Sequence, residues 1–363
     1  MLRKIAKFLL HIALWSAIIA AVVWASMLSK NHRDSSLVTS TDIEVEGGGR
    51  NPLIAAERVD LWLKEQGVHP EGSILSKVDI AAIERIVEQH SAVAEANVYV
   101  AYGGGVKVAI EQREPIARLR MSGYDMYLTA DGYLLPAVDC NSAHVKVVTG
   151  DYKPLFAGNY TGDVASIVRD SIASLERYIA ELEEAKLPHF KRHIENNKRL
   201  REIKRSSPKK SLFDSKEKHE ILVKAYKELC SDAVEEHSIT MSAIDADIAA
   251  IEREQETARS LKRSLLHEAE EFSAMVAMIR HILEDEFLNN EVVQIVASGG
   301  KREPLQLAIV PRSADFIVDL GQAENLERKL STLRMFYAKG LSRIGWDKFS
   351  RVSLRYDGQV VCR

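Results

Sequence analysis

The sequence predicts an α+β protein that has a single transmembrane helix and a long helical insertion within its β-rich part. Three observations support this prediction. Residues 8–28 contain no Lys, Arg, Asp or Glu. Residues 163–298 contain no glycine, although the chain has 19. The remaining sequence alternates strand-like and helix-like periods that are separated by glycine-containing turns.

The composition is that of a globular protein without an overall charge bias. The 363 residues include 49 Lys and Arg against 52 Asp and Glu, and the formal net charge is -3. This balance excludes a global basic field that would hold nucleic acid through its phosphates. The three cysteines, Cys140, Cys230 and Cys362, are widely spaced and form neither a disulfide framework nor a zinc pattern, so we expect isolated thiols.

The uncharged segment from Phe8 to Leu28 is predicted to span a membrane. As a helix it rises about 31 Å, which matches the roughly 30 Å hydrocarbon core of a bilayer. It also exceeds the apolar region of about 7 to 15 residues that is typical of a cleavable signal peptide. Basic residues precede it without an acidic one: Arg3, Lys4 and Lys7. This bias predicts that residues 1–7 are cytoplasmic and that the rest of the chain lies across the membrane.

A polar linker over residues 29–40 is expected to lead into a β-α-α-β-β module over residues 41–117. The triplet Gly103-Gly104-Gly105 separates the last two strands as a hairpin turn. The other expected elements are a strand over 41–46, a helix capped by Asn51 and stopped by Gly67, a helix opened by a Ser76–Asp79 capping box, and strands near 96–102 and 106–110.

Several short motifs follow this module in a fixed order. They are EQREPIAR at 111–118, YLTADGY at 127–133, QIV at 294–296, the Gly345-Trp346 pair, LRYD at 354–357 and QVVC at 359–362. Placed after a single membrane span, they resemble the FtsQ/DivIB family of bacterial cell-division proteins, and FtsQ sequences from the Bacteroidetes in particular. The resemblance implies a POTRA domain (polypeptide-transport-associated) over 41–117 and an FtsQ-type β domain over 118–162 and 273–363.

Residues 163–272 interrupt the expected β domain with coiled-coil spacing. Charged residues make up 47 of the 126 residues from Asp163 to Leu288. Apolar residues recur at intervals of three and four on both the outbound and the returning segment, with polar Gln255 and Lys262 on the returning seam. The Ser206-Ser207-Pro208 turn then predicts an antiparallel helical hairpin. Because the returning segment is longer than the outbound one, we also expect a break near residues 236–240.

No catalytic constellation is present in the sequence, so we expect no enzyme activity, no cofactor and no metal site. The patterns G-x-S-x-G, the P-loop and H-E-x-x-H do not occur. His189 and His193 have the four-residue spacing of metal ligands on a helix. Without a further ligand in the motif, we interpret them as solvated histidines rather than a zinc site.

A basic stretch lies near the predicted turn of the hairpin. Residues 191–210 contain nine Lys or Arg against only Glu195 and Glu202. A solvated coiled-coil tip is the simplest interpretation. A sharper hypothesis is that Lys198, Arg199 and Arg201 contact an anionic surface, either lipid headgroups or an acidic patch of a partner.

The carboxyl-terminal residues 351–361 alternate apolar and polar side chains and predict a last strand at the edge of a sheet. An exposed edge offers unpaired N–H and C=O groups to a strand from another chain. The resemblance to FtsQ implies that a segment of FtsB binds there and that FtsL completes a trimeric complex. The partner-binding residues implied by this matching are Arg355, Tyr356, Gly358 and Val360.

The expected function is therefore a non-catalytic divisome scaffold. It would be a single-pass protein of the inner membrane, with its bulk in the periplasm at the midcell division site, and it would help control septal peptidoglycan synthesis. A rival interpretation is a POTRA-containing protein of outer-membrane assembly or secretion, in which a strand edge captures client proteins. An envelope enzyme tethered by the coil is a third class, and it lacks any recognisable nucleophile or metal set.

Overall fold

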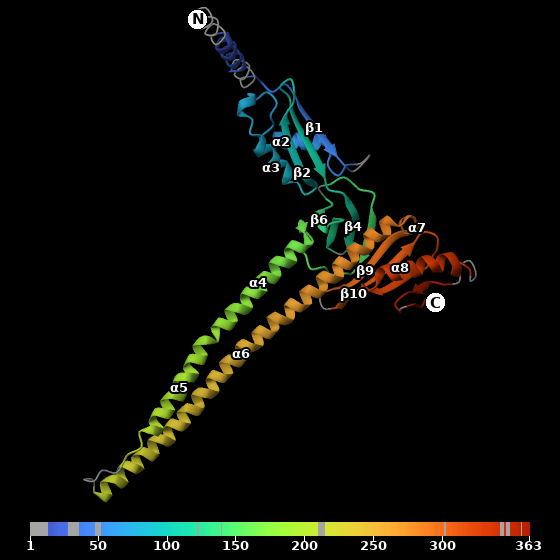
Figure 1. The fold of residues 1–363 in the computed structure, drawn as a ribbon. Coiled ribbons are helices and arrows are strands. Elements are labelled where there is room, and N and C mark those ends of the chain that lie inside the picture. Colours follow the sequence, from blue (N-terminus) through green and yellow to red (C-terminus); the bar gives the residue numbers. More distant parts are fainter. Residues whose placement is uncertain are drawn as a thin grey trace, which may run out of the picture. The chain divides into compact units, whose positions relative to one another are not determined.

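The computed structural model describes residues 14–27, 36–47, 52–121, 123–138, 140–209, 215–300, 303–341, 345, 349–356 and 358–363. These residues form two compact units. One unit contains the chain up to Val164 together with 273–299 and 305–363, and the other contains 165–272 with 300–304. Each unit is described separately below (Figure 1).

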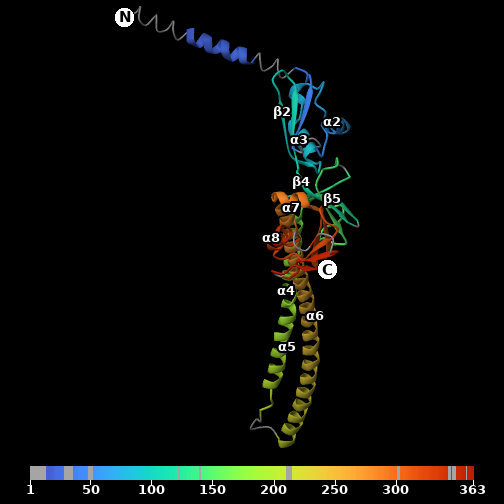
Figure 2. The same cartoon turned by 90° about the vertical axis from the view of Figure 1, so that its right-hand side faces the viewer.

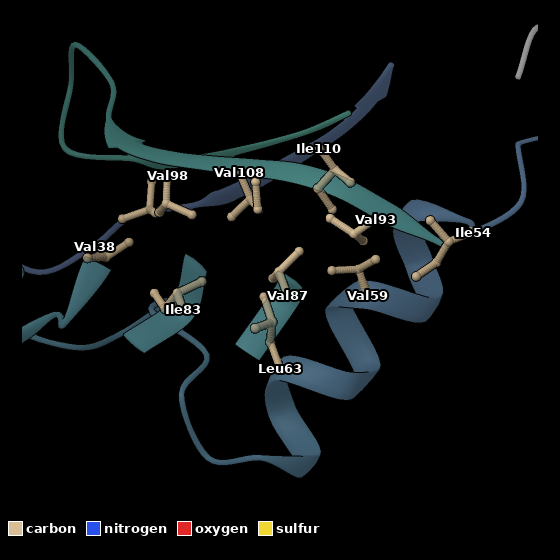
Figure 3. Packing of buried hydrophobic residues seen from close by; sticks show 12 residues of the cluster. Val38, Ile54, Val59, Leu63, Ile83, Val87, Val93, Val98, Val108 and Ile110 are labelled. Carbon is tan, nitrogen blue, oxygen red and sulfur yellow. The ribbon is translucent and has the colours of Figure 1, made fainter. Parts of the chain in front are cut away.

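The first half of the larger unit is a β-α-α-β-β module, as the sequence predicts. Its sheet has the strand order β1-β3-β2, with β1 parallel and β2 antiparallel to β3. The helices cover one face, where Leu63 and Val87 point toward Val98 and Val108 of the sheet (Figure 3). The elements are β1 (Thr41–Glu46), α2 (Ala56–Glu65), η1 (Leu75–Lys77), α3 (Ile80–Glu88), β2 (Val93–Val100) and β3 (Val106–Gln112).

Both helices of this module begin later than predicted. Asn51, the expected cap of the first helix, lies outside the described residues, and α2 starts at Ala56. The preceding Leu53 is held elsewhere: it is buried in a cluster with Tyr127 and Leu135, and its N–H donates to the Gln112 side chain at 2.7 Å. This tertiary contact takes Leu53 out of the helix. The second helix is capped by Asp79, whose carboxylate accepts from the Ala82 N–H at 2.9 Å, so the predicted cap at Ser76 is wrong.

The second half of the larger unit contains a sheet of ten described strands, with the order β13-β12-β11-β10-β9-β7-β4-β5-β6-β8. The strands before the insertion are β4 (Pro115–Met121), β5 (Tyr124–Thr129), β6 (Tyr133–Pro136), β7 (Lys146–Gly150) and β8 (Gly162–Asp163). Those after it are β9 (Val292–Gly300), β10 (Glu303–Pro311), β11 (Ile317–Gln322), β12 (Arg351–Ser353) and β13 (Val361–Cys362). Three helical segments accompany them: α7 (Glu286–Glu291), α8 (Leu326–Met335) and η2 (Phe336–Leu341).

The two groups of strands join through β7 and β9, which pair in parallel from Val147↔Gln294 to Gly150↔Ala297. Side chains reinforce this ladder. The Lys146 ammonium donates to the carbonyl of Val292 at 2.9 Å, and the Gln294 amide donates to the Thr149 hydroxyl at 2.6 Å. Burial lowers the pKa of Lys146. One continuous sheet is therefore built from segments on either side of the insertion.

The smaller unit is an antiparallel helical hairpin. Helices α4 (Val164–Ala185) and α5 (Leu187–Arg205) run out, and α6 (Lys216–Glu284) returns beside them in both views (Figures 1 and 2). The polar seam residues are satisfied across the pair. The Gln255 amide donates to the Glu183 carboxylate at 2.8 Å, and Lys262 pairs with Glu176 at 2.5 Å.

The break predicted near residues 236–240 is wrong, because α6 is continuous over 69 residues. The extra length of α6 is accounted for by its last part. From Ser273 onward α6 belongs to the larger unit, where Met275, Ile279 and Ile282 are fully buried.

The prediction that His189 and His193 are both solvated is wrong in part. His189 faces α6, with its Nδ1 3.4 Å from an Asp247 carboxylate oxygen.

The structure describes only part of the predicted membrane span. Residues 14–27 are helical and exposed, while the ends of the span, Phe8 and Leu28, lie outside the described residues. Within the residues that are described, no helix combines the length and the apolar character needed to cross a bilayer.

The β7–β9 ladder predicts a strong effect of Gly150→Ala. Gly150 has φ 119°, and a Cβ there would lie 2.1 Å from the Ala297 carbonyl oxygen. Gly132→Ala is the matched control, since Gly132 also has a positive φ (87°) but its Cβ would meet nothing within 4 Å. We expect the control to lose about 1 to 2 kcal/mol, from the backbone conformation alone, and Gly150→Ala to lose clearly more in chemical denaturation. Equal losses would mean that the close approach of β7 and β9 is not a constraint.

Candidate functional site

The candidate site lies at the end of the larger sheet, where β11, β12 and β13 are neighbours. β12 is parallel to β11 through Ile317↔Arg351 and Asp319↔Ser353. β13 is antiparallel to β12 and is the terminal strand among those described. The sequence predicted one continuous edge strand over residues 351–361, and this is wrong. The strand breaks after Ser353, and β13 begins only at Val361.

An ion pair explains where the strand breaks. Asp319 on β11 accepts from the Arg355 guanidinium at 2.8 Å, and its other carboxylate oxygen accepts from the Gly321 N–H at 3.0 Å. The Asp319 side chain is only 12% exposed. The Asp319 carbonyl also accepts from the Leu354 N–H at 2.8 Å. Asp319 therefore holds the chain just after β12 against β11, through both its backbone carbonyl and its carboxylate.

The four residues that the sequence singled out for partner binding lie together around this break. Arg355, Tyr356 and Gly358 are exposed, and Val360 is half-buried. The Tyr356 side chain is 63% exposed, although aromatic side chains of this size are usually covered in a folded protein. Gly358 has φ 67°, a left-handed conformation that favours glycine. Gly358 therefore belongs to a turn between two short strands rather than to a strand.

A shallow hollow of about 190 Å³ opens beside this turn. Its lining is rich in guanidinium groups and consists of Asp319, Arg351, Ser353, Arg355, Tyr356, Val361 and Arg363. Its three arginine side chains outnumber its one side-chain carboxylate, which is itself paired with Arg355. The hollow therefore presents donors suited to acceptor groups of a bound chain.

Burial raises the pKa of the Cys362 thiol on β13, which keeps this cysteine protonated rather than a nucleophilic thiolate.

Sequence reasoning missed Asp319, Arg351 and Arg363. Asp319 had one local signal, since an Asp side chain that accepts from the N–H two residues later is a common turn device and Gly321 is in that position. Arg351 and Arg363 reach the hollow only because β12 and β13 pair, through contacts such as the Arg363 N–H to the Arg351 carbonyl at 2.9 Å. No short sequence pattern encodes that pairing.

The second predicted set, Lys198, Arg199 and Arg201, lies on α5 in the other compact unit. All three residues are exposed. Arg199 pairs with Glu236 of α6 at 3.1 Å, and Lys198 approaches Glu202 at 3.9 Å. The structure thus gathers Arg355, Tyr356, Gly358 and Val360 at one site and keeps the basic helix as a separate feature.

A β-α-α-β-β module followed by an interrupted sheet defines a class of modular α+β proteins. Comparison with protein families gives two matches. A POTRA-like domain matches residues 37–111, and a family described as FtsQ/DivIB, C-terminal related, matches residues 244–363. This chain is an FtsQ/DivIB-related protein. A search of curated proteins finds no match. The matched family is generally non-catalytic.

The Asp319–Arg355 pair predicts different outcomes for two substitutions at Asp319. Asp319→Ala leaves the Gly321 N–H and the Arg355 guanidinium without their acceptor, and we expect a loss of about 1 to 3 kcal/mol. Asp319→Asn retains an acceptor oxygen and should lose less. Hydrogen–deuterium exchange of residues 349–363 should rise more in Asp319→Ala than in Asp319→Asn. Unchanged exchange in both variants would mean that another contact fixes the turn.

Proposed function

We propose that this chain is a non-catalytic scaffold of the bacterial divisome that captures FtsB- and FtsL-type division proteins at its carboxyl-terminal strand edge. The supporting observation is that the FtsQ/DivIB-related region ends in β12 and β13, beside an arginine-lined hollow and an exposed Tyr356. A segment of the partner would add to the sheet beside β13. Arg355, Tyr356, Gly358 and Val360 would contact it from the turn.

The same proposal assigns roles to the other segments. Residues 8–28 would anchor the chain in the inner membrane, with residues 1–7 in the cytoplasm and residues 29–40 as the linker. Residues 41–117 would form the POTRA domain, residues 118–162 and 273–363 the β domain, and residues 163–272 the inserted coiled coil. Capture of the partners would place the protein at midcell, where it would help control septal peptidoglycan synthesis.

A second candidate is a POTRA-containing protein of outer-membrane assembly or secretion. The observation that favours it is the POTRA-like domain itself. The edge strands of its sheet, β1 and β2, would pair with strands of client proteins. The two candidates differ in the cellular process that requires the protein. A divisome scaffold is needed for septation, whereas an assembly factor is needed for the insertion or export of its clients.

Depletion of the protein in its own host tests this choice. The scaffold proposal expects a fluorescent fusion at midcell and filamentous cells on depletion, because septal synthesis would lose a regulator. The level of folded outer-membrane proteins serves as the control and should stay constant during the first divisions. A diffuse envelope signal with normal division and falling outer-membrane protein levels would favour the second candidate.

Tyr356→Asp tests the proposed binding site. A charge on this exposed ring would remain solvated in the free protein but would be buried against the partner, so we expect at least a tenfold loss of FtsB-type partner in co-purification. Tyr102→Asp is the matched control, because Tyr102 is a fully exposed tyrosine in the β2–β3 turn. Equal co-purification by both variants and the parent would remove Tyr356 from the site.

A further inference from the structure

The distal half of the helical hairpin has polar side chains where a coiled coil usually has apolar ones. The side-chain oxygen Oδ1 of Asn197 lies 3.1 Å from His237 Nε2, and the side-chain amide of Asn196 donates to the His237 backbone carbonyl at 3.2 Å. Nearer the base of the hairpin the seam buries apolar residues beside the polar Gln255, with Ile244 fully buried and Ala258 5% exposed. The α5–α6 contact therefore buries less apolar surface toward its tip.

Large apolar side chains in the same region face outward. Leu187, Phe190 and Ile194 of α5 are 56%, 46% and 65% exposed. Their spacing of three and four places them on one stripe of the helix. A two-helix coil in water normally has the reverse arrangement, with its apolar stripe inside and its polar residues outside. This stripe therefore indicates a contact beyond the hairpin.

The stripe lies on a definable face of the hairpin. Arg199 and Glu236 directly precede Leu200 and His237, which are half-buried residues of the seam. Their ion pair at 3.1 Å therefore marks one flank of the helix pair. Leu187, Phe190 and Ile194 directly follow the covered residues Lys186, His189 and His193, so they lie on the opposite flank. On α6, Val234, Met241 and Asp245 follow Ala233, Thr240 and Ile244 in the same way.

The two helices also carry opposite charge. Helix α5 has seven Lys or Arg against two Glu, whereas residues 228–256 of α6 have nine Asp or Glu against one Arg. The contacts Asn197–His237 and His189–Asp247 show that these oppositely charged stretches lie at the same level of the hairpin. Much of this charge stays exposed, including Lys198 of α5 (75%) and Glu236 of α6 (60%).

We propose that the covering partner is a second copy of this chain, docked side by side through the stripe so that α5 of each copy lies against α6 of the other. A two-fold axis along the hairpin keeps the levels matched and brings each basic α5 beside an acidic α6. Every helix then has antiparallel neighbours, which is the up-down arrangement of a four-helix bundle. Phe190 and Ile194 are buried against the Met241–Asp245 flank of the partner, and Leu187 lies nearer the base, at the level of Glu252.

This assignment draws on the helical unit alone and is independent of the proposed divisome function. Lipid headgroups would satisfy the basic side chains of α5 but would repel the acidic stretch at the same level. A second copy satisfies both charges and the apolar stripe together. Of the three cations that the sequence singled out, Arg201 follows the half-buried Leu200 and lies on the flank of the stripe, so it receives an acidic protein surface as its partner. Arg199 stays paired with Glu236 of its own chain on the opposite flank.

Molar mass of the full chain in detergent tests the proposal by light scattering, with the mass of bound detergent subtracted. We expect a dimer for the parent and at least a tenfold weaker dimer for Ile194→Glu, because the new carboxylate would be buried in the interface. Ile221→Glu is the matched control: Ile221 is 66% exposed on α6 and does not follow a seam residue. Far-ultraviolet circular dichroism checks that both variants retain their helix content.

A charge-swap experiment identifies the partner. We expect the dimer to be weakened in Lys198→Glu/Arg201→Glu and also in Glu235→Lys/Asp245→Lys, because α5 and α6 of each variant then carry more similar charge. An equimolar mixture of the two variants should recover the dimer, since each reversed helix meets the oppositely reversed one.

Three results would overturn the proposal. They are a parent that stays monomeric at all concentrations, equal effects of Ile194→Glu and Ile221→Glu, and a mixture that does not recover. Binding of a monomeric parent to phosphatidylglycerol vesicles, lost in Lys198→Glu/Arg201→Glu, would instead assign the basic helix to an anionic membrane surface.

Discussion

The parallel pairing of β7 with β9 is the constraint on which the ten-stranded sheet of the larger unit depends. It joins residues about 145 apart in the sequence, as the Gln294–Thr149 hydrogen bond shows. Closing a flexible loop of that length would cost several kcal/mol of chain entropy. An antiparallel helical hairpin avoids much of this cost, because α4 and α5 lead the chain away from the sheet and α6 brings it back. The insertion is therefore compatible with the sheet only in a form that brings its ends together, and strands β10 to β13 take their positions from β9.

Much of the fold follows from local sequence, and the errors share one physical cause. The β-α-α-β-β order, the glycine turns and the helical hairpin were predictable from periodicity and from glycine placement. The helix start at Asn51 failed because Leu53 is buried against Tyr127, and the break near residues 236–240 failed because the end of α6 is buried in the larger unit. In each case a contact between distant residues overrode a local signal.

The residues of the candidate site also fall into those that local sequence predicts and those that depend on distant contacts. The turn with Arg355, Tyr356, Gly358 and Val360 could be located because its residues are close together in the sequence and carry a family resemblance. Asp319 could not, since its role depends on the parallel pairing of β11 with β12 over a separation of 36 residues. The predicted edge strand was too long for the same reason. Nothing in the alternation of residues 351–361 reveals that Asp319 draws Arg355 out of the strand.

The shortness of β13 bears on how a partner strand could be held. A two-residue edge offers about two backbone hydrogen bonds, each worth roughly 0.5 to 1.5 kcal/mol net. Micromolar affinity requires about 8 kcal/mol. Ladder bonds along β13 alone would therefore fall well short, and most of the binding energy would have to come from side chains. Tyr356 and the arginine-lined hollow are the groups placed to supply it, while the short edge limits nonspecific pairing with other strands.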